Sequence, residues 1–239
     1  MRLLRGWRKN PYDAFPYLMA STLTVRSVDM MRKAFGWQKH ATLLDDDLDQ
    51  FNYLEDLNDR RRHDAELIAT VCANHPADNI VEIGTAAGRT TALMATNAPD
   101  ATVHTVNIPP EEIPKGGRFT TCAPERDEIG RVYREMGLEN VRQILANTAS
   151  WQPDISPVDI ALIDGSHDAR FVYNDTRLML NHARPGTILL WHDFAPELAP
   201  VYPWIADVCR GIDRLFRKRI LRGRILHLQD SWLGLYRVD

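Results

Sequence analysis

Polar side chains capable of acid–base or metal chemistry follow two apolar runs of the sequence. The run VDIALI ends in Asp164 with His167 close behind it, and the run TILLW ends in His192 and Asp193. Such groups are costly at the end of a buried strand unless they bind something. Carboxylates and an imidazole can hold Mg²⁺ or Mn²⁺, and an imidazole can also act as a general base near neutral pH. We therefore expect Asp164, His192 and Asp193 to hold a divalent metal, or His167 or His192 to act as a base.

A glycine-rich turn forms the second stretch with chemical potential. NIVEIGTAAGRTT, residues 79–91, reads as an apolar strand, a turn containing Gly84 and Gly88, and then a helix. Glycines let a ligand approach the backbone, and the helix start offers free N–H groups. The dinucleotide fingerprint G-x-G-x-x-G needs a glycine where Ala86 stands. The turn therefore indicates a nucleotide-type ligand and does not favour a nicotinamide dinucleotide.

Alternating elements are expected to bring these stretches together. Strands are predicted at 79–83, 102–107, 141–145, 158–163, 187–191, 224–229 and 232–238, and helices at 59–74, 89–97, 124–136, 168–182 and 201–217. This alternation is typical of a doubly wound α/β sheet that is mostly parallel. The short turn between the last two strands requires an antiparallel pair. Since ligands bind at the carboxyl ends of parallel strands, the glycine turn, Asp164 and His192–Asp193 should open onto one crevice.

Composition limits the class of protein. A chain of 239 residues suits one large α/β domain, and we assign it to residues 59–239 with a mainly helical extension or lid at 1–58. The net charge of −3 argues against general nucleic-acid binding. Cys72, Cys122 and Cys209 show no disulfide or zinc spacing. The sequence also has no apolar stretch of the ~20 residues that a membrane span needs. These features predict a soluble, cytoplasmic protein without a nucleic-acid or membrane partner, and they leave homo-oligomerisation open.

Glu82-x-Gly84-x-x-x-Gly88 resembles motif I of the class I S-adenosylmethionine-dependent methyltransferases. The resemblance implies a Rossmann-like sheet of seven strands, the last one antiparallel. The cofactor-binding residues that it implies are Glu82, Gly84, Thr85, Ala86, Gly88, Asn107, Asn147, Thr148 and Asp164. Asn107 and Asn147 stand where the family usually has acidic residues that contact the ribose and the adenine. Both amides keep hydrogen-bonding capacity but lose the charge that strengthens it.

IDGSH and WHDF together resemble one branch of that family, which contains cephalosporin-hydroxylase-like and macrocin O-methyltransferase-like proteins, with catechol O-methyltransferase more distant. Metal-dependent members carry one acidic ligand after the fourth strand and two adjacent ligands after the fifth. The corresponding positions here are Asp164, His192 and Asp193, and His192 departs from the usual acidic residue. Asp175 matches a further acidic position common in the branch.

The resemblance implies O-methylation of a hydroxyl on a small molecule, a secondary metabolite or a sugar, as in natural product tailoring. The implied cofactors are S-adenosylmethionine and a divalent metal, Mg²⁺ or Mn²⁺, and the predicted catalytic residues are Asp164, His167 and His192. An NAD(P)-dependent oxidoreductase and a non-catalytic methyltransferase-like binding module are the alternatives. Residues 1–58, 108–121 and 195–203 are expected to cover the site and determine specificity.

Overall fold

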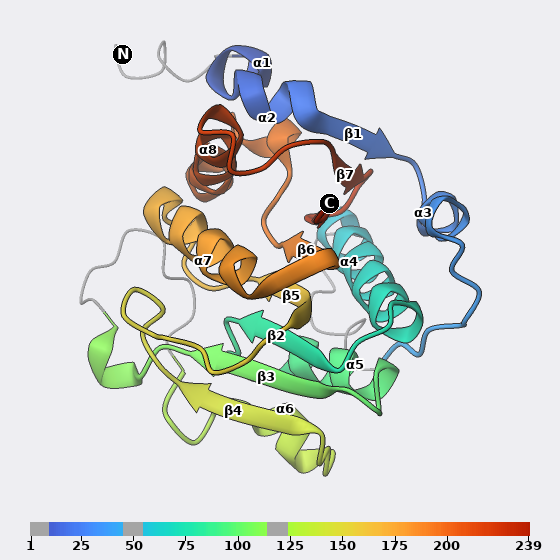
Figure 1. The fold of residues 1–239 in the computed structure, drawn as a ribbon, viewed down its shortest axis with the longest axis vertical. Helices are drawn as coiled ribbons and strands as arrows, with labels where there is room; N and C mark the ends of the chain where they lie inside the picture. Colours follow the sequence, from blue (N-terminus) through green and yellow to red (C-terminus); the bar gives the residue numbers. More distant parts are fainter. Residues whose placement is uncertain (1–9, 45–54, 114–123) are drawn as a thin grey trace.

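One mixed sheet organises the molecule (Figure 1). The computed structural model describes residues 10–44, 55–113 and 124–239. The strands are β1 (Thr22–Val25), β2 (Asn79–Ile83), β3 (Thr102–Asn107), β4 (Val141–Leu145), β5 (Val158–Ile163), β6 (Ala183–Trp191), β7 (Ile225–Leu228) and β8 (Gly234–Arg237). Their order is β1-β7-β8-β6-β5-β2-β3-β4. All neighbouring strands pair in parallel except β8, which is antiparallel to both β6 and β7.

Helices cover both faces of this sheet. The described helices are α1 (Pro11–Ala14), α2 (Pro16–Ser21), α3 (Val28–Phe35), α4 (Glu55–Asn74), α5 (Arg89–Asn97), α6 (Arg131–Glu135), α7 (Ala169–His182) and α8 (Pro203–Arg217), with 3-10 turns η2 (Pro110–Glu112) and η3 (Pro196–Leu198). The α7–α8 pair packs on one face, and the α4–α5 pair packs on the other (Figure 1). None of the helices in the described part of the chain is long and apolar enough to cross a membrane.

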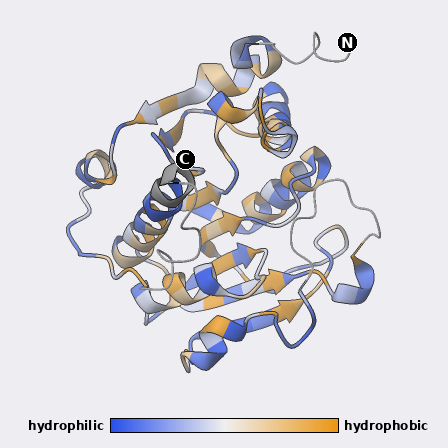
Figure 2. Cartoon of the chain, turned by 180° about the vertical axis from the view of Figure 1, so that it is seen from behind, coloured by the Kyte–Doolittle hydropathy of each residue, from blue (hydrophilic) through white to orange (hydrophobic). Residues whose placement is uncertain are grey.

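The apolar runs of the sequence form strands because their residues alternate between two cores. In β5, Ile160 and Leu162 contact the α4–α5 side, whereas Ala161 and Ile163 contact the α7–α8 side. Every residue of β5 is buried, as expected for a parallel strand covered on both faces. Figure 2 shows hydrophobic residues gathered along the central strands. The predicted doubly wound, mostly parallel sheet with an antiparallel last strand is confirmed.

In the described part of the chain the sheet has eight strands rather than the predicted seven. The additional strand β1 pairs in parallel with β7, with Thr22 opposite Ile225. Its sequence, TLTV, lacks the buried alternation that predicts a strand, and Leu23 is 46% exposed. Main-chain pairing at a sheet edge therefore determines this strand, rather than burial. The division of the chain at residue 58 stays a prediction.

The helix predicted at 124–136 is much shorter in the structure. Only Arg131–Glu135 is an α-helix, because Gly130 adopts a φ of 71° at its start. A left-handed residue there cannot continue a right-handed helix. At the other end of the fold, β6 begins four residues earlier than predicted, at Ala183.

Candidate active site

A cavity of about 570 Å³ opens at the carboxyl ends of β2 to β6. This volume lies in the usual range for small-molecule sites, roughly 300–1,000 Å³. Predicted site residues that line it are Gly84, Ala86, Asn107, Asn147, Thr148, Asp164, His167, Asp175, His192 and Asp193. The structure therefore brings both polar stretches of the sequence to one crevice, as the strand-end argument predicted. Glu82, Thr85 and Gly88 do not line this cavity.

The glycine turn is pressed against the start of the loop after β5. Gly84 has a φ of 110°, and its N–H donates to the Val106 carbonyl oxygen at 2.8 Å. A Cβ at this position would collide with the main-chain carbonyl of Asp164. The two loops can approach so closely only because residue 84 is glycine. The turn is thus shaped by main-chain contacts between β2, β3 and β5.

Asn107 fixes the same turn from β3. Its Oδ1 accepts a hydrogen bond from the Ala86 N–H at 3.1 Å, and its Nδ2 donates to the Ile108 carbonyl oxygen at 2.9 Å. Ala86 itself has a φ of 45°, a conformation that needs such support. A carbonyl oxygen has two lone pairs, so Asn107 can hold the turn and still accept one bond from a ribose hydroxyl.

Glu82 braces the turn from inside the protein. Its Oε2 accepts hydrogen bonds from the hydroxyls of Thr105, at 2.5 Å, and Thr91. Thr105 also contacts the Thr85 hydroxyl at 2.7 Å. Burial raises the pKa of Glu82 to about 8, although the two hydroxyls act in the opposite direction. Glu82 is fully buried and does not line the cavity, and its predicted contact with the cofactor's amino group stays a prediction.

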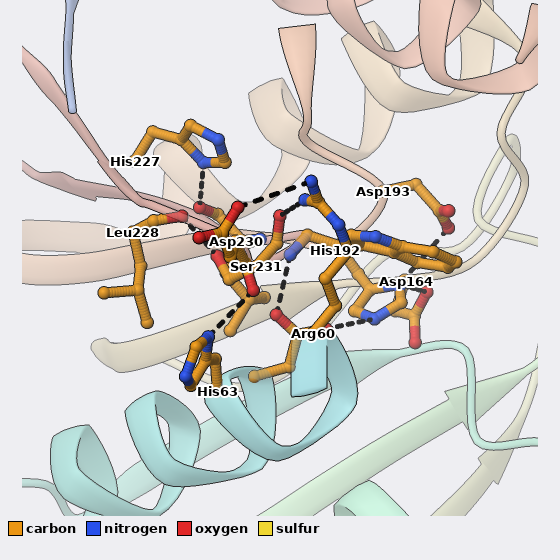
Figure 3. Close-up of polar contacts among 12 residues, drawn as sticks. Arg60, His63, Asp164, His192, Asp193, His227, Leu228, Asp230 and Ser231 are labelled. Atoms are coloured by element: carbon orange, nitrogen blue, oxygen red, sulfur yellow. Dashed lines mark hydrogen bonds and ion pairs between the residues drawn. The ribbon is translucent and has the colours of Figure 1, made fainter. Parts of the chain in front are cut away.

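Charged groups gather on the β5–β6 side of the cavity (Figure 3). His192 Nδ1 lies 3.2 Å from Asp164 Oδ1 and 3.2 Å from Asp193 Oδ2. His167 Nε2 lies 3.0 Å from the same Asp193 oxygen. The other oxygen of Asp193 accepts a hydrogen bond from Trp204 Nε1 at 3.1 Å. Asp193 has a φ of 54°, a costly conformation for a residue other than glycine, so the turn after β6 carries strain while it directs this carboxylate toward the imidazoles.

The mutual contacts determine the charges of this cluster. Burial alone would raise the pKa of Asp193, but the charges of His192 and His167 hold it well below its ordinary value. Burial alone would lower the pKa of His192, but Asp164 and Asp193 together raise it well above its ordinary value. These shifts favour the carboxylate form of Asp193 and the imidazolium form of His192. An imidazolium has no free lone pair, so His192 can neither accept a proton nor bind a metal while it keeps this charge.

A donor set for a metal exists beside His192. Among the described residues, Asp164, His167 and Asp193 each place one ligand atom within 4.8 Å of the others. His167 Nδ1 is also buried and finds no hydrogen-bond partner among the residues that the structure describes. Two carboxylates and an imidazole fit Mg²⁺ or Mn²⁺ by their chemistry. This set contains His167 where the sequence predicted His192, and His192 as a ligand stays a prediction.

Asp175 connects the two sides of the cavity. It lies on α7, is 1% exposed, and contacts Thr148 in the loop after β4. Burial raises the pKa of Asp175 to about 7, while the Thr148 hydroxyl acts in the opposite direction. Phe171, Trp204 and Trp232 add aromatic walls. Trp191, the last residue of β6, is fully buried in the core.

Sequence reasoning missed Asp64, a buried residue of α4. Asp64 Oδ2 lies 3.5 Å from His192 Nε2, on the opposite side of the ring from Asp164 and Asp193. Asp64 is 5% exposed, and its neighbours Ala65 and Ile68 belong to the buried face of the helix. A carboxylate within such an apolar face is the signal that could have revealed it, because unpaired charges are rarely buried.

Comparisons with known proteins identify chains of similar fold. Residues 81–194 match the model of a family described as a methyltransferase domain. No curated protein matches the chain. Among solved structures, the O-methyltransferase NovP is 17% identical, with 89% of this chain and 98% of that chain covered and a TM-score of 0.60. The methyltransferase PaMTH1 of Podospora anserina, bound to S-adenosylhomocysteine, is 15% identical, with 91% and 98% covered and a TM-score of 0.57.

A third similar structure is the O-methyltransferase TomG of Streptomyces achromogenes, in complex with S-adenosylmethionine and involved in tomaymycin synthesis. It is 16% identical, the alignment covers 100% of both chains, and the TM-score is 0.50. At such identities the likeness establishes the fold.

Proposed function

We propose that the protein is an S-adenosylmethionine-dependent methyltransferase that methylates a hydroxyl oxygen of a small molecule. The match of residues 81–194 to a methyltransferase-domain model and the fold shared with NovP support this proposal. The observation that carries the proposal is the single cavity in which the glycine turn and the charged cluster meet. The turn at Gly84–Gly88 would hold the cofactor, and Asp164, His167 and Asp193 would face the acceptor. The O-methyltransferases NovP and TomG support oxygen as the accepting atom.

The reaction requires positioning and removal of one proton. The acceptor oxygen forms a bond to the methyl carbon while the carbon–sulfur bond breaks, and S-adenosylhomocysteine leaves with the electron pair on sulfur. Alignment of the two reactants supplies much of the rate gain in such a displacement. The hydroxyl proton passes to a base, and we assign that role to Asp164, whose side chain is 26% exposed, with His167 as the alternative. The cationic His192 would orient Asp164 and Asp193 by hydrogen bonds.

A divalent metal fits the donor set described above. Asp164, His167 and Asp193 would hold it, as part of the proposal. When bound, the cation would lower the pKa of the acceptor hydroxyl. In its absence the same carboxylates would contact the acceptor directly.

The acceptor class follows from the cavity walls. Phe171, Trp204 and Trp232 offer aromatic surfaces beside the charged cluster. Such walls suit a hydroxylated ring, a sugar or a secondary metabolite. The involvement of TomG in tomaymycin synthesis supports a role in natural product tailoring.

Calorimetric titration with S-adenosylhomocysteine, with and without Mn²⁺, tests the proposal. We expect binding in both conditions, and tighter binding or a separate metal isotherm when Mn²⁺ is present. An Asp193→Ala variant should keep cofactor binding and lose the metal isotherm. Absence of S-adenosylhomocysteine binding by the folded protein would refute the proposal. NAD⁺ is the matched control ligand and should not bind, because Ala86 replaces a fingerprint glycine.

A further inference from the structure

Side chains on one face of α4 form hydrogen bonds with the turn between β7 and β8, residues 229–233 (Figure 3). The contacts are Arg60 Nη1 to the Ser231 carbonyl oxygen at 2.9 Å, His63 Nδ1 to the Asp230 carbonyl oxygen at 2.9 Å, and the Trp232 N–H to Asp64 Oδ1 at 2.7 Å. Residues three and four apart lie on the same side of a helix, so three side chains meet three consecutive backbone groups. The helix and the turn are therefore held in one fixed relation.

Asp64 uses only one of its two carboxylate oxygens, Oδ1, to bind this turn. The other, Oδ2, is buried, has no hydrogen-bond partner within the described ranges, and lies 3.5 Å from His192 Nε2. The opposite ring nitrogen of His192 faces Asp164 and Asp193 at 3.2 Å each. Carboxylates thus stand at both ring nitrogens. Rotation of the ring would place carbon atoms against them, so the pair of contacts defines one ring orientation.

Trp232 links the same helix to the cavity. Its main-chain N–H is held by Asp64, and its ring lies edge-on to the ring of His192 with centroids 6.0 Å apart. Trp232 also lines the cavity. The position of Asp64 therefore affects both the imidazole and an aromatic wall of the site.

We propose that Asp64 is a positioning residue that sets the orientation of His192, with one oxygen on the β7–β8 turn and the other on the imidazole Nε2. His192 Nδ1 is thereby directed at Asp164 and Asp193, the carboxylates on the acceptor side. Helix α4 lies outside the matched residues 81–194, so the site also depends on an element that the family match does not cover. The inference rests on the proposed function only in treating this cavity as the acceptor site.

Nuclear magnetic resonance of the histidine rings in the ¹⁵N-labelled full chain tests the inference. Asp64→Asn keeps an acceptor oxygen for the Trp232 N–H and can place an NH₂ group, a donor, opposite His192 Nε2. We expect the ring signals of His192, assigned by their loss in His192→Gln, to shift in Asp64→Asn. Unchanged His192 signals in a folded Asp64→Asn protein would overturn the inference.

Asp159 provides a matched control. It is also a buried carboxylate, 1% exposed, and it accepts backbone hydrogen bonds from Asp78 and Asn79 at 2.8 and 3.0 Å at the opposite end of the strands. Asp159→Asn should leave the His192 signals unchanged, which separates a specific effect from general destabilisation. If Asp64→Asn does not fold, the inference can still be tested in the unaltered protein. Its His192 Nε2 proton should exchange slowly with solvent, and rapid exchange would contradict a contact with Asp64.

A double-mutant cycle measures whether Asp64 acts through His192. Asp64→Asn should weaken Mn²⁺ binding about tenfold, because a displaced His192 ring would no longer orient the two carboxylate ligands Asp164 and Asp193. In a His192→Gln background the same change should have almost no effect. A full tenfold loss in that background would overturn the inference. Failure of the proposed function is read separately, from S-adenosylhomocysteine binding by the unaltered protein.

Discussion

The two sides of the cavity are built from different chemistry. The lining residues at the ends of β2, β3 and β4, among them Gly84, Ala86, Asn107 and Asn147, are all neutral, and main-chain contacts shape them. At the ends of β5 and β6, carboxylates and imidazoles contact one another directly. The lining of the neutral side should therefore depend mainly on backbone shape. The charged side should depend on which groups carry charge.

Gly84→Ala should have the largest effect, on the neutral side. The added Cβ would meet the Asp164 carbonyl, and the φ of 110° is unfavourable for alanine. We expect a loss of at least about 3 kcal/mol in the free energy of unfolding, from strain and overpacking combined, and loss of S-adenosylhomocysteine binding. Urea unfolding measures the loss of stability, and calorimetry measures the loss of S-adenosylhomocysteine binding. Gly36→Ala is the control, since Gly36 also has positive φ but open space around it. It should cost about 1 kcal/mol, and equal losses would contradict the proposed collision.

Asp193→Asn should have the next largest effect, on the charged side. His192 and His167 would lose the carboxylate that they share, while Trp204 keeps an acceptor oxygen. Breaking a buried pair from one side costs roughly 3 kcal/mol. Urea unfolding at pH 7 with a chelator present measures this cost. Asp168→Asn, at the exposed N-cap of α7, should be almost neutral. A similar loss of stability in both variants would contradict the stabilising role of the contacts between Asp193 and the two histidines.

Asp175→Asn tests the junction between the two sides through pH. Burial raises the pKa of Asp175 in the folded protein to about 7, above its unfolded value of about 4. The folded state therefore holds the proton more tightly, and its stability falls as pH rises from about 4 through 7. Asparagine cannot ionise, so the advantage of the variant should grow by about 2.5 kcal/mol between pH 5 and pH 8. Thermal unfolding at several pH values measures this growth, and an advantage independent of pH would contradict the raised pKa.

Asn107→Asp should have the smallest effect and would make the neutral side charged. An aspartate keeps the acceptor for the Ala86 N–H and restores the acidic residue that the methyltransferase resemblance places there. A charged acceptor strengthens a hydrogen bond by about 1 kcal/mol, so S-adenosylhomocysteine should bind roughly fivefold more tightly. Calorimetry measures the change. Weaker binding would show that the donation from Asn107 to the Ile108 carbonyl matters more.

Burial explains which parts of the fold were predictable. The bounds of β2, β3, β4, β5 and α5 agree with the predicted ranges because each contains apolar residues with a regular period and ends at a turn signal such as Gly84. β1 was missed because pairing at an edge leaves little trace in side-chain polarity. α6 was overextended because the sequence pattern continues through Gly130, whose left-handed conformation depends on its contacts with Ala86 and Tyr133.

The location of the candidate site was predictable for similar reasons, but the contacts within it were not. Asp164, His192 and Asp193 could be placed together because they follow buried strands that end at the same edge of the sheet. Which carboxylate contacts which imidazole could not be predicted, since these contacts depend on differences in distance below 4 Å. His167 rather than His192 lies in the possible metal set, and Asp64 reaches the site from a helix without any motif. Glu82 shows the same limit, since strand alternation alone does not show that Thr91 and Thr105 bind its buried carboxyl.

The pairing of β1 with β7 has a consequence for synthesis of the chain. Thr22 and Ile225 are neighbours in the sheet although about 200 residues separate them. At roughly 5–20 residues per second, a ribosome needs about 10 to 40 s to make the intervening chain. During that time β1 has no β7 to pair with, while the central strands β2 to β6 can already assemble. β1, which is made long before β7, is then added at the edge of the sheet once β7 and β8 are in place.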